Sequence, residues 1–204
     1  GAVDWGSGAM WMLAPAMALA MDISPWEVGL LFAIRQVVSG LVQLPAGLVG
    51  DAISSRGSFL LAMFWCVAVA QLLASIVDGY WLVVVFLSLA CIGAAAWHPV
   101  AMGTMVQQMP DRRAFALAIH SMGGTAAEIF APLLVGFLLI FLDWRQVLQV
   151  NTIPAIVVGL IFLRLARMIP QSPQGALTKS NFFTFARSII RPSVLVVICM
   201  LLLH

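Results

Sequence analysis

Long apolar runs follow one another through most of this chain, and each is long enough for a helix that crosses a membrane. Such a helix needs about 20 predominantly apolar residues to span the hydrocarbon core of a bilayer. Hydrophobic residues make up 63% of the 204 residues. Only 9% are charged, against about 25% in an ordinary soluble domain. A soluble fold of this length cannot hide so much apolar surface, so the sequence predicts an all-α integral membrane protein.

The limits of the apolar runs predict six membrane-spanning helices that form one N-terminal domain over residues 1–166. The six ranges are 1–21, 26–50, 58–77, 80–107, 114–141 and 145–166. A polar linker is expected at 167–192, where NFFTFARSIIRP is typical of a short amphipathic helix at a membrane surface. A seventh apolar run occupies 193–204. We therefore expect a longer natural protein, in which a second six-helix half follows the first.

The positions of the basic residues predict the orientation of the helices. One set of loops and helix ends holds eight of the ten Lys and Arg residues: Arg56, Arg112, Arg113, Arg164, Arg167, Lys179, Arg187 and Arg191. The opposite set holds only Arg145, beside several acidic residues. Because positively charged loops stay in the cytoplasm, we expect the N-terminus, the loop between the second and third helices, and the linker to be cytoplasmic. We expect the membrane to be a bacterial inner membrane.

Charge and cysteine content argue against several classes of function. The net charge of +2 gives no sign of a nucleic-acid partner, and the three cysteines lie in apolar runs without metal-ligand spacing. The sequence has no phosphate-binding loop and no nucleophile triad. We therefore predict neither an enzyme nor a bound metal or cofactor. The partners expected are the lipid bilayer, a small-molecule substrate and protons.

The segment GLVGDAISSRGSFLL, residues 47–61, carries the first family resemblance. It resembles the signature G-x-L-A-D-R-x-G-R-K, which joins the second and third helices of major facilitator transporters. Gly47, Gly50 and Asp51 match this signature, while Ser55 stands where a basic residue is usual and Arg56 restores one charge. In that family the aspartate latches the two halves together on the cytoplasmic side. An ordinary polar turn is the alternative interpretation.

Residues 97–139 resemble the fourth and fifth helices of the fosmidomycin-resistance-like branch of the same superfamily. That branch has a His-Pro pair, matched by His98 and Pro99, and then a Gly-Gly pair and a Gly-Pro-Leu-Leu, here APLL at 131–134. It also has an aspartate early in its first helix, matched by Asp4. The resemblance implies two inverted three-helix repeats in half of a twelve-helix fold. It also implies alternating access and proton-driven export.

His98 is unusual because a histidine and a proline interrupt a long apolar run. Pro99 removes a backbone hydrogen bond and kinks the helix, and the freed carbonyl of Ala95 needs a partner in a dry environment. Asp4, His98 and His120 all fall in the predicted cytoplasmic half of the membrane. Ionisable residues at such depth are functional candidates, so we predict that these three bind protons or substrate. The alternatives are a packing role for His98 and a wet, interfacial position for Asp4 and His120.

Arg35 and Glu128 form a second pair of candidates. Counted from opposite ends at about 1.5 Å per residue, they reach nearly the same depth in the outer half of the membrane. Opposite charges at one depth can offset the cost of leaving water. We therefore predict that they approach each other or share a wet cavity, either as a fixed pair or as one that opens when protons or substrate bind.

Proton-coupled export of a small molecule is the function that these features favour. A channel would require polar stripes along several helices, and we expect only isolated polar residues. A non-transporting membrane scaffold or sensor built on a half-bundle is the remaining alternative. The identity of the substrate does not follow from the sequence.

Overall fold

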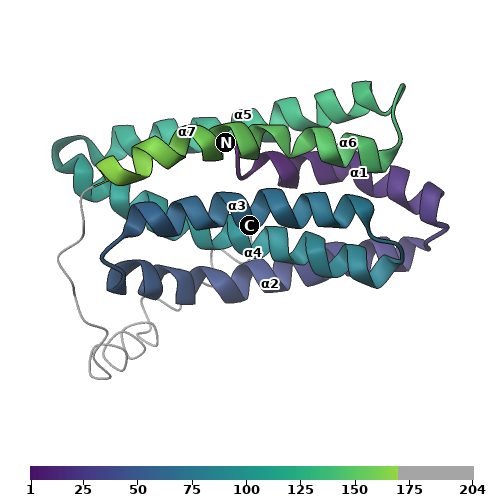
Figure 1. Cartoon of the computed structure of the whole chain (residues 1–204), viewed down its shortest axis with the longest axis horizontal. Helices are drawn as coiled ribbons and strands as arrows, with labels where there is room; N and C mark the ends of the chain where they lie inside the picture. Colours follow the sequence, from purple (N-terminus) through teal and green to yellow (C-terminus); the bar gives the residue numbers. More distant parts are fainter. Residues whose placement is uncertain (170–204) are drawn as a thin grey trace.

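The computed structural model describes residues 1–169, which form a bundle of helices lying side by side along one axis (Figure 1). The helices are α1 (Trp5–Met21), α2 (Pro25–Ala52), α3 (Arg56–Ile76), α4 (Tyr80–Gln108), α5 (Arg113–Leu138), α6 (Trp144–Asn151) and α7 (Ile153–Leu165). Short 3-10 turns follow α4 and α7, at Pro110–Arg112 and Ala166–Met168. Most of the predicted linker and the predicted helix at 193–204 lie outside the described residues.

Five helical segments are long and apolar enough to cross a membrane: α2, α3, α4, Pro110–Leu138 and Trp144–Met168. These segments contain 21 to 29 residues, whereas α1 contains 17. The predicted first helix begins later than expected because the carbonyl of Gly1 accepts hydrogen bonds from the N–H groups of Asp4 and Trp5, which forms a turn. Five of the six predicted spans are thus confirmed by length and composition, and the sixth stays a prediction.

The predicted single helix at 145–166 is wrong in one respect, because it is divided into α6 and α7 at Thr152. Pro154 has no N–H to donate to the carbonyl of Val150, and its ring would clash with that carbonyl in a continuous helix. At the break, the hydroxyl of Thr152 donates to the carbonyl of Gln149 at 2.6 Å. The side chain of Asn151 is fixed there as well, because it accepts a hydrogen bond from the indole N–H of Trp5 at 2.8 Å.

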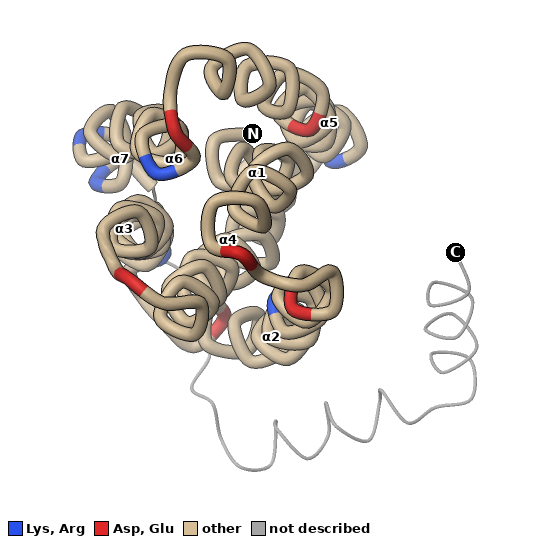
Figure 2. The backbone as a smooth tube through the Cα atoms, turned by 90° about the vertical axis from the view of Figure 1, so that its right-hand side faces the viewer, with Lys and Arg blue, Asp and Glu red and all other residues tan. Residues whose placement is uncertain are grey.

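Helix α1 lies near the middle of the bundle (Figure 2) and supplies much of the apolar core. Met10, Leu13 and Met17 are fully buried, and they belong to one cluster with Val135 of α5 and Leu148 of α6. A Cβ at Gly8 would lie 3.1 Å from the carbonyl oxygen of Ala127 and from the Cα of Glu128. The absence of a side chain at Gly8 therefore lets α1 and α5 approach closely, as small residues do between membrane helices.

Candidate functional site

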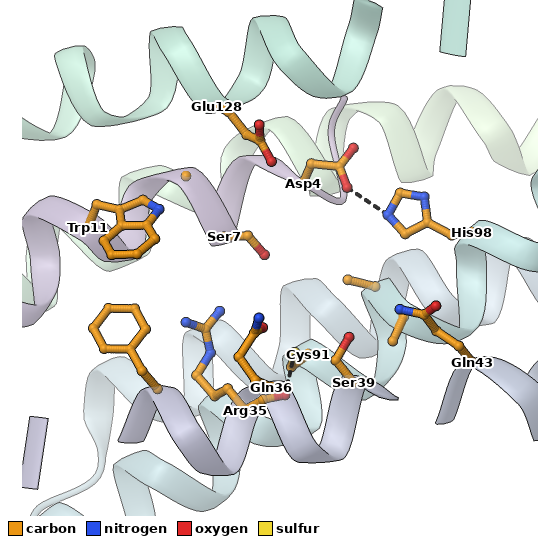
Figure 3. Close-up of a pocket in the computed structure, with 14 residues that line it drawn as sticks. Asp4, Ser7, Trp11, Arg35, Gln36, Ser39, Gln43, Cys91, His98 and Glu128 are labelled. Carbon is orange, nitrogen blue, oxygen red and sulfur yellow. Dashed lines mark hydrogen bonds and ion pairs between the residues drawn. The ribbon is translucent and has the colours of Figure 1, made fainter. Parts of the chain in front are cut away.

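A cavity of about 590 Å³ opens between α1, α2, α4 and α5, and we call it the central cavity (Figure 3). Its size is within the usual range of about 300–1,000 Å³ for small-molecule sites. The lining residues are Asp4, Ser7, Gly8, Trp11, Phe32, Arg35, Gln36, Ser39, Gln43, Cys91, Ala94, Ala95, His98 and Glu128. Four residues predicted as candidates, Asp4, Arg35, His98 and Glu128, are thus brought together around one space.

Asp4 and His98 are in direct contact across the inner part of the cavity. Asp4 immediately precedes α1, and its carboxylate makes no hydrogen bond to the first turn of that helix. Oδ1 instead lies 2.7 Å from Nε2 of His98 on α4, and Oδ2 lies 2.7 Å from the Gly1 nitrogen. An ionised carboxylate can only accept, so Nε2 of His98 carries the proton of this bond. This bond joins α4 to the residue that precedes α1.

His120 of α5 extends this pair to a third helix. Its Nε2 lies 3.4 Å from Nδ1 of His98, whose other ring nitrogen faces Asp4. The ring of His120 stacks on Trp97, with centroids 5.5 Å apart and an angle of 20° between the planes. His120 does not line the central cavity but lies behind His98. The three ionisable groups predicted for this half of the membrane form a chain, Asp4–His98–His120.

Arg35 of α2 is buried without a partner. Its residue is only 9% exposed, and its Nε has no hydrogen-bond partner in the structure. No ion pair involves Arg35 within residues 1–169, although the guanidinium group points into the central cavity (Figure 3). Its backbone is held against α4, because the thiol of Cys91 donates to the carbonyl of Arg35 at 3.4 Å.

Glu128 of α5 lies across the cavity from Arg35 and also points into it (Figure 3). The two residues share the cavity, which is one of the two arrangements that their depth predicts. The other arrangement, a direct ion pair, does not occur among the described residues. Arg35 and Glu128 are therefore two separate charges facing the same space.

A polar stripe along α2 was missed by the sequence analysis. Gln36, Ser39 and Gln43 line the cavity together with Arg35, so the expectation of isolated polar residues is wrong for this helix. Their spacing of three to four residues repeats once per helical turn and places them on one face. This period in the polar residues of 26–50 was the signal in the sequence. The other walls of the cavity carry fewer polar residues: Asp4 and Ser7 at α1, His98 on α4 and Glu128 on α5.

The predicted motif between the second and third helices lies apart from the cavity, where α2 ends and α3 begins. Its residues are Gly47, Gly50, Asp51 and Arg56. The guanidinium of Arg56 donates to the carbonyl of Gly50 at 3.0 Å, to Gln107 Oε1 at 2.6 Å and to Asp51 Oδ1 at 3.0 Å. Gly50 is in the last turn of α2, where carbonyls have no partner within the helix. Arg56 therefore joins the ends of α2, α3 and α4.

The kink residue Pro99 lies inside α4 and faces the glycines of the same region. A Cβ at Gly47 would contact Pro99, and a Cβ at Gly50 would overlap the side chain of Val100. The contact at Gly47 would be an ordinary one, at 3.7 Å from the Pro99 Cβ, whereas Gly50 lets α2 pack closely against α4. The close packing is therefore a structural basis for glycine at Gly50.

The comparisons with known proteins agree with this architecture. Residues 2–204 match the family described as Major Facilitator Superfamily. The chain is 24% identical over 200 residues to a "Probable 4-methylmuconolactone transporter" of Cupriavidus pinatubonensis (strain JMP 134 / LMG 1197), covering 91% of this chain and 46% of the relative. It is 26% identical over 125 residues to the "Uncharacterized MFS-type transporter YwoD" of Bacillus subtilis (strain 168), covering 61% and 27%.

A solved structure has the same fold. It is the crystal structure of a bacterial homolog of the human lysosomal transporter Spinster, in an inward-facing and unoccupied conformation. The TM-score is 0.67 at 19% sequence identity, and the match covers 85% of this chain and 42% of that chain. The chain thus spans less than half the length of each of these proteins.

Proposed function

Because this chain belongs to the Major Facilitator Superfamily, we propose that it forms the N-terminal half of a secondary transporter that works by alternating access. Its six helices would form two inverted three-helix repeats, and a second six-helix half would complete the central cavity. The relatives named above are transporters about twice as long or longer, which supports this arrangement. The Arg56 end of the bundle faces the cytoplasm, in a bacterial inner membrane, and Gly1 lies beside Gly123 of α5, partway along the bundle (Figure 1).

The proposed transport reaction is export of a small molecule in exchange for protons. The observation that carries it is the contact of 2.7 Å between Asp4 and His98 on the wall of the central cavity. A carboxylate hydrogen-bonded to an imidazole is a pair of groups that can both hold a proton, which supports a role in proton coupling. His120 lies behind His98 and offers a second site for the same proton.

In this mechanism, protonation changes the contact between α1 and α4. A protonated Asp4 no longer attracts a charged His98, and the link between the two helices weakens. Helix α1 also packs against α5, and α4 against α2 and α3, so loosening this link lets two groups of helices move relative to each other. A substrate held in the central cavity would be released on one side in one proton state and bound in the other.

The size of the cavity supports a small organic molecule as substrate. A volume of about 590 Å³ holds a compound of one or two rings, and its walls combine aromatic with hydrogen-bonding side chains. The name of the Cupriavidus relative indicates that a family member of this kind is assigned a small organic compound as cargo. We propose the same class of cargo, a small metabolite or drug, for this chain.

The test uses the full-length natural protein in proteoliposomes. Radiolabelled small organic compounds are first screened for exchange without a proton gradient, and the exchanged compound is then followed under an imposed gradient at several pH values. We expect Asp4→Asn and His98→Gln to abolish gradient-driven accumulation and its pH dependence, because the proton site is lost. Both variants should retain exchange, which needs no net proton movement.

Asp111→Asn is the matched control, because this exposed aspartate lies in the turn after α4 and does not line the central cavity. It should leave both accumulation and exchange unchanged. An unaltered rate and pH profile in Asp4→Asn, His98→Gln and Glu128→Gln together would remove the proton-coupling assignment. A full-length protein that exchanges no compound would favour the scaffold alternative.

A further inference from the structure

The unpartnered guanidinium of Arg35 is the feature of the central cavity that proton coupling does not explain. Arg35 is nine-tenths buried, and no acidic residue of the described 1–169 pairs with it, so its charge loses hydration without an ion pair there to offset the loss. Arginine stays charged at all physiological pH values, so a buried guanidinium in a bilayer needs a hydrogen-bonding or anionic partner. Arg35 lines the wall of the central cavity, so the open space of the cavity offers a place where such a partner can lie.

The acidic residues of the cavity do not supply this partner. Asp4 has its Oδ1 on His98 and its Oδ2 on the Gly1 nitrogen. Glu128 projects from α5 on the opposite wall, and no ion pair joins it to Arg35 in the described residues. The guanidinium group, with five N–H donors in a flat fork, therefore faces the cavity with room for a planar oxyanion.

The residues next to Arg35 define what else a ligand must offer. One helical turn before it, Phe32 stacks on Trp11 of α1, with ring centroids 5.2 Å apart and 24° between the planes. On the other side, Gln36 and Ser39 present amide and hydroxyl groups to the same space (Figure 3). The wall therefore runs from aromatic, through cationic, to neutral polar along one face of α2.

We infer that the central cavity takes a small organic anion whose carboxylate binds Arg35 and whose apolar part lies against Trp11 and Phe32. This inference deepens the proposed function and rests on the central cavity being the substrate site. Arginine pairs with carboxylate through two parallel hydrogen bonds, which are stronger than bonds between neutral groups. A neutral analogue of the same shape cannot form these charged hydrogen bonds and should bind more weakly. A cation is repelled by the positive charge of Arg35.

Quenching of Trp11 fluorescence tests the anion site without a known substrate. The purified full-length protein in detergent is titrated with iodide, an anionic quencher, and the signal of Trp11 is obtained by difference from Trp11→Phe. We expect Arg35→Gln to lower the iodide quenching constant by on the order of twofold, the effect of one unit charge screened by water. Acrylamide, a neutral quencher, should act equally on both proteins, which also shows that the variant is folded.

Arg164→Gln is the matched control, because it removes the same charge from an exposed site on α7. It should leave iodide quenching of Trp11 unchanged. Arg35→Lys should retain iodide quenching, because it keeps the charge in the cavity. Iodide quenching that is the same in Arg35→Gln as in the native protein would overturn the inference.

Benzoate and benzamide then test the substrate class, because they share a shape and differ in charge. We expect benzoate to shield Trp11 from acrylamide at a concentration roughly tenfold lower than benzamide, and Arg35→Gln to remove this difference. Arg35→Lys should reduce it, because a lysine lacks the planar fork. Equal shielding by the two compounds, or no shielding by benzoate, would overturn the inference.

The two proposals fail in different ways. Loss of benzoate preference in Arg35→Gln with a normal pH profile in Asp4→Asn and His98→Gln would uphold the anion site and remove proton coupling. If Asp4→Asn and His98→Gln lose gradient-driven accumulation while Arg35→Gln keeps the preference for benzoate, proton coupling is upheld and the anion site is removed.

Discussion

The two buried arginines of the structure, Arg35 and Arg56, have opposite surroundings. Arg56 is 4% exposed and donates to a helix-end carbonyl, an amide and a carboxylate. Arg35 is 9% exposed and has no ion-pair partner among residues 1–169. Both side chains are withdrawn from water, and only Arg56 has hydrogen-bond partners that offset this cost within the described fold. The difference is consistent with a structural role for Arg56 and supports our proposal that Arg35 binds a ligand in the cavity.

The largest effect is expected for Arg56→Gln. The substitution leaves a carbonyl of the last turn of α2 and the Gln107 amide without their donors, and it should lower the free energy of unfolding by about 3 kcal/mol. Thermal unfolding of the full-length protein in detergent measures this loss. Arg164→Gln, on the exposed surface of α7, should change it by less than about 0.5 kcal/mol. If Arg56→Gln also changes the free energy of unfolding by less than about 0.5 kcal/mol, Arg56 has no structural role.

Arg35→Gln should behave in the opposite way in the same measurement. Removing an unpaired buried charge relieves its desolvation, so the free energy of unfolding should stay the same or rise by about 1 kcal/mol. If Arg35→Gln instead destabilises the protein as much as Arg56→Gln, the contrast between the two arginines is false. Arg35 would then have a structural partner, and the case for a ligand at this side chain would be lost.

The smallest effect is expected for Asp51→Asn. Its side chain is 78% exposed, and ion pairs in contact with water contribute little. The free energy of unfolding should fall by less than about 1 kcal/mol, because Arg56 keeps its bonds to Gly50 and Gln107. A transport rate that nevertheless falls in Asp51→Asn would assign the aspartate to the movement between conformations rather than to the stability of one of them.

Sequence reasoning was most successful where the signal is local. The length and apolarity of each run are properties of consecutive residues, and five of the predicted spans match helices of the structure. The division of the last predicted helix at Thr152 was missed, although Pro154 marked it. The reason is that a proline in the first turn of a helix and a proline inside a helix give the same apolar pattern.

The candidate site was found in part. The rarity of ionisable residues in apolar runs was enough to select Asp4, Arg35, His98, His120 and Glu128, and four of them line the central cavity. The polar face of α2 escaped notice because Gln36, Ser39 and Gln43 carry no charge, and only their period distinguishes them. The partners of each candidate could not be read from depth, since Arg35 and Glu128 share a level and a cavity without forming a pair.

The sequence by itself determined that this protein is a helical membrane protein and which segments are long and apolar enough to span a membrane, because hydrophobic length is fixed along the chain. Only the tertiary structure decided that Asp4 contacts His98 across 94 residues and that Arg35 forms no ion pair with an acid of residues 1–169. Which face of each helix turns inward depends on close packing at small residues such as Gly8 and Gly50. Those contacts join helices that are distant in the chain, so no local pattern contains them.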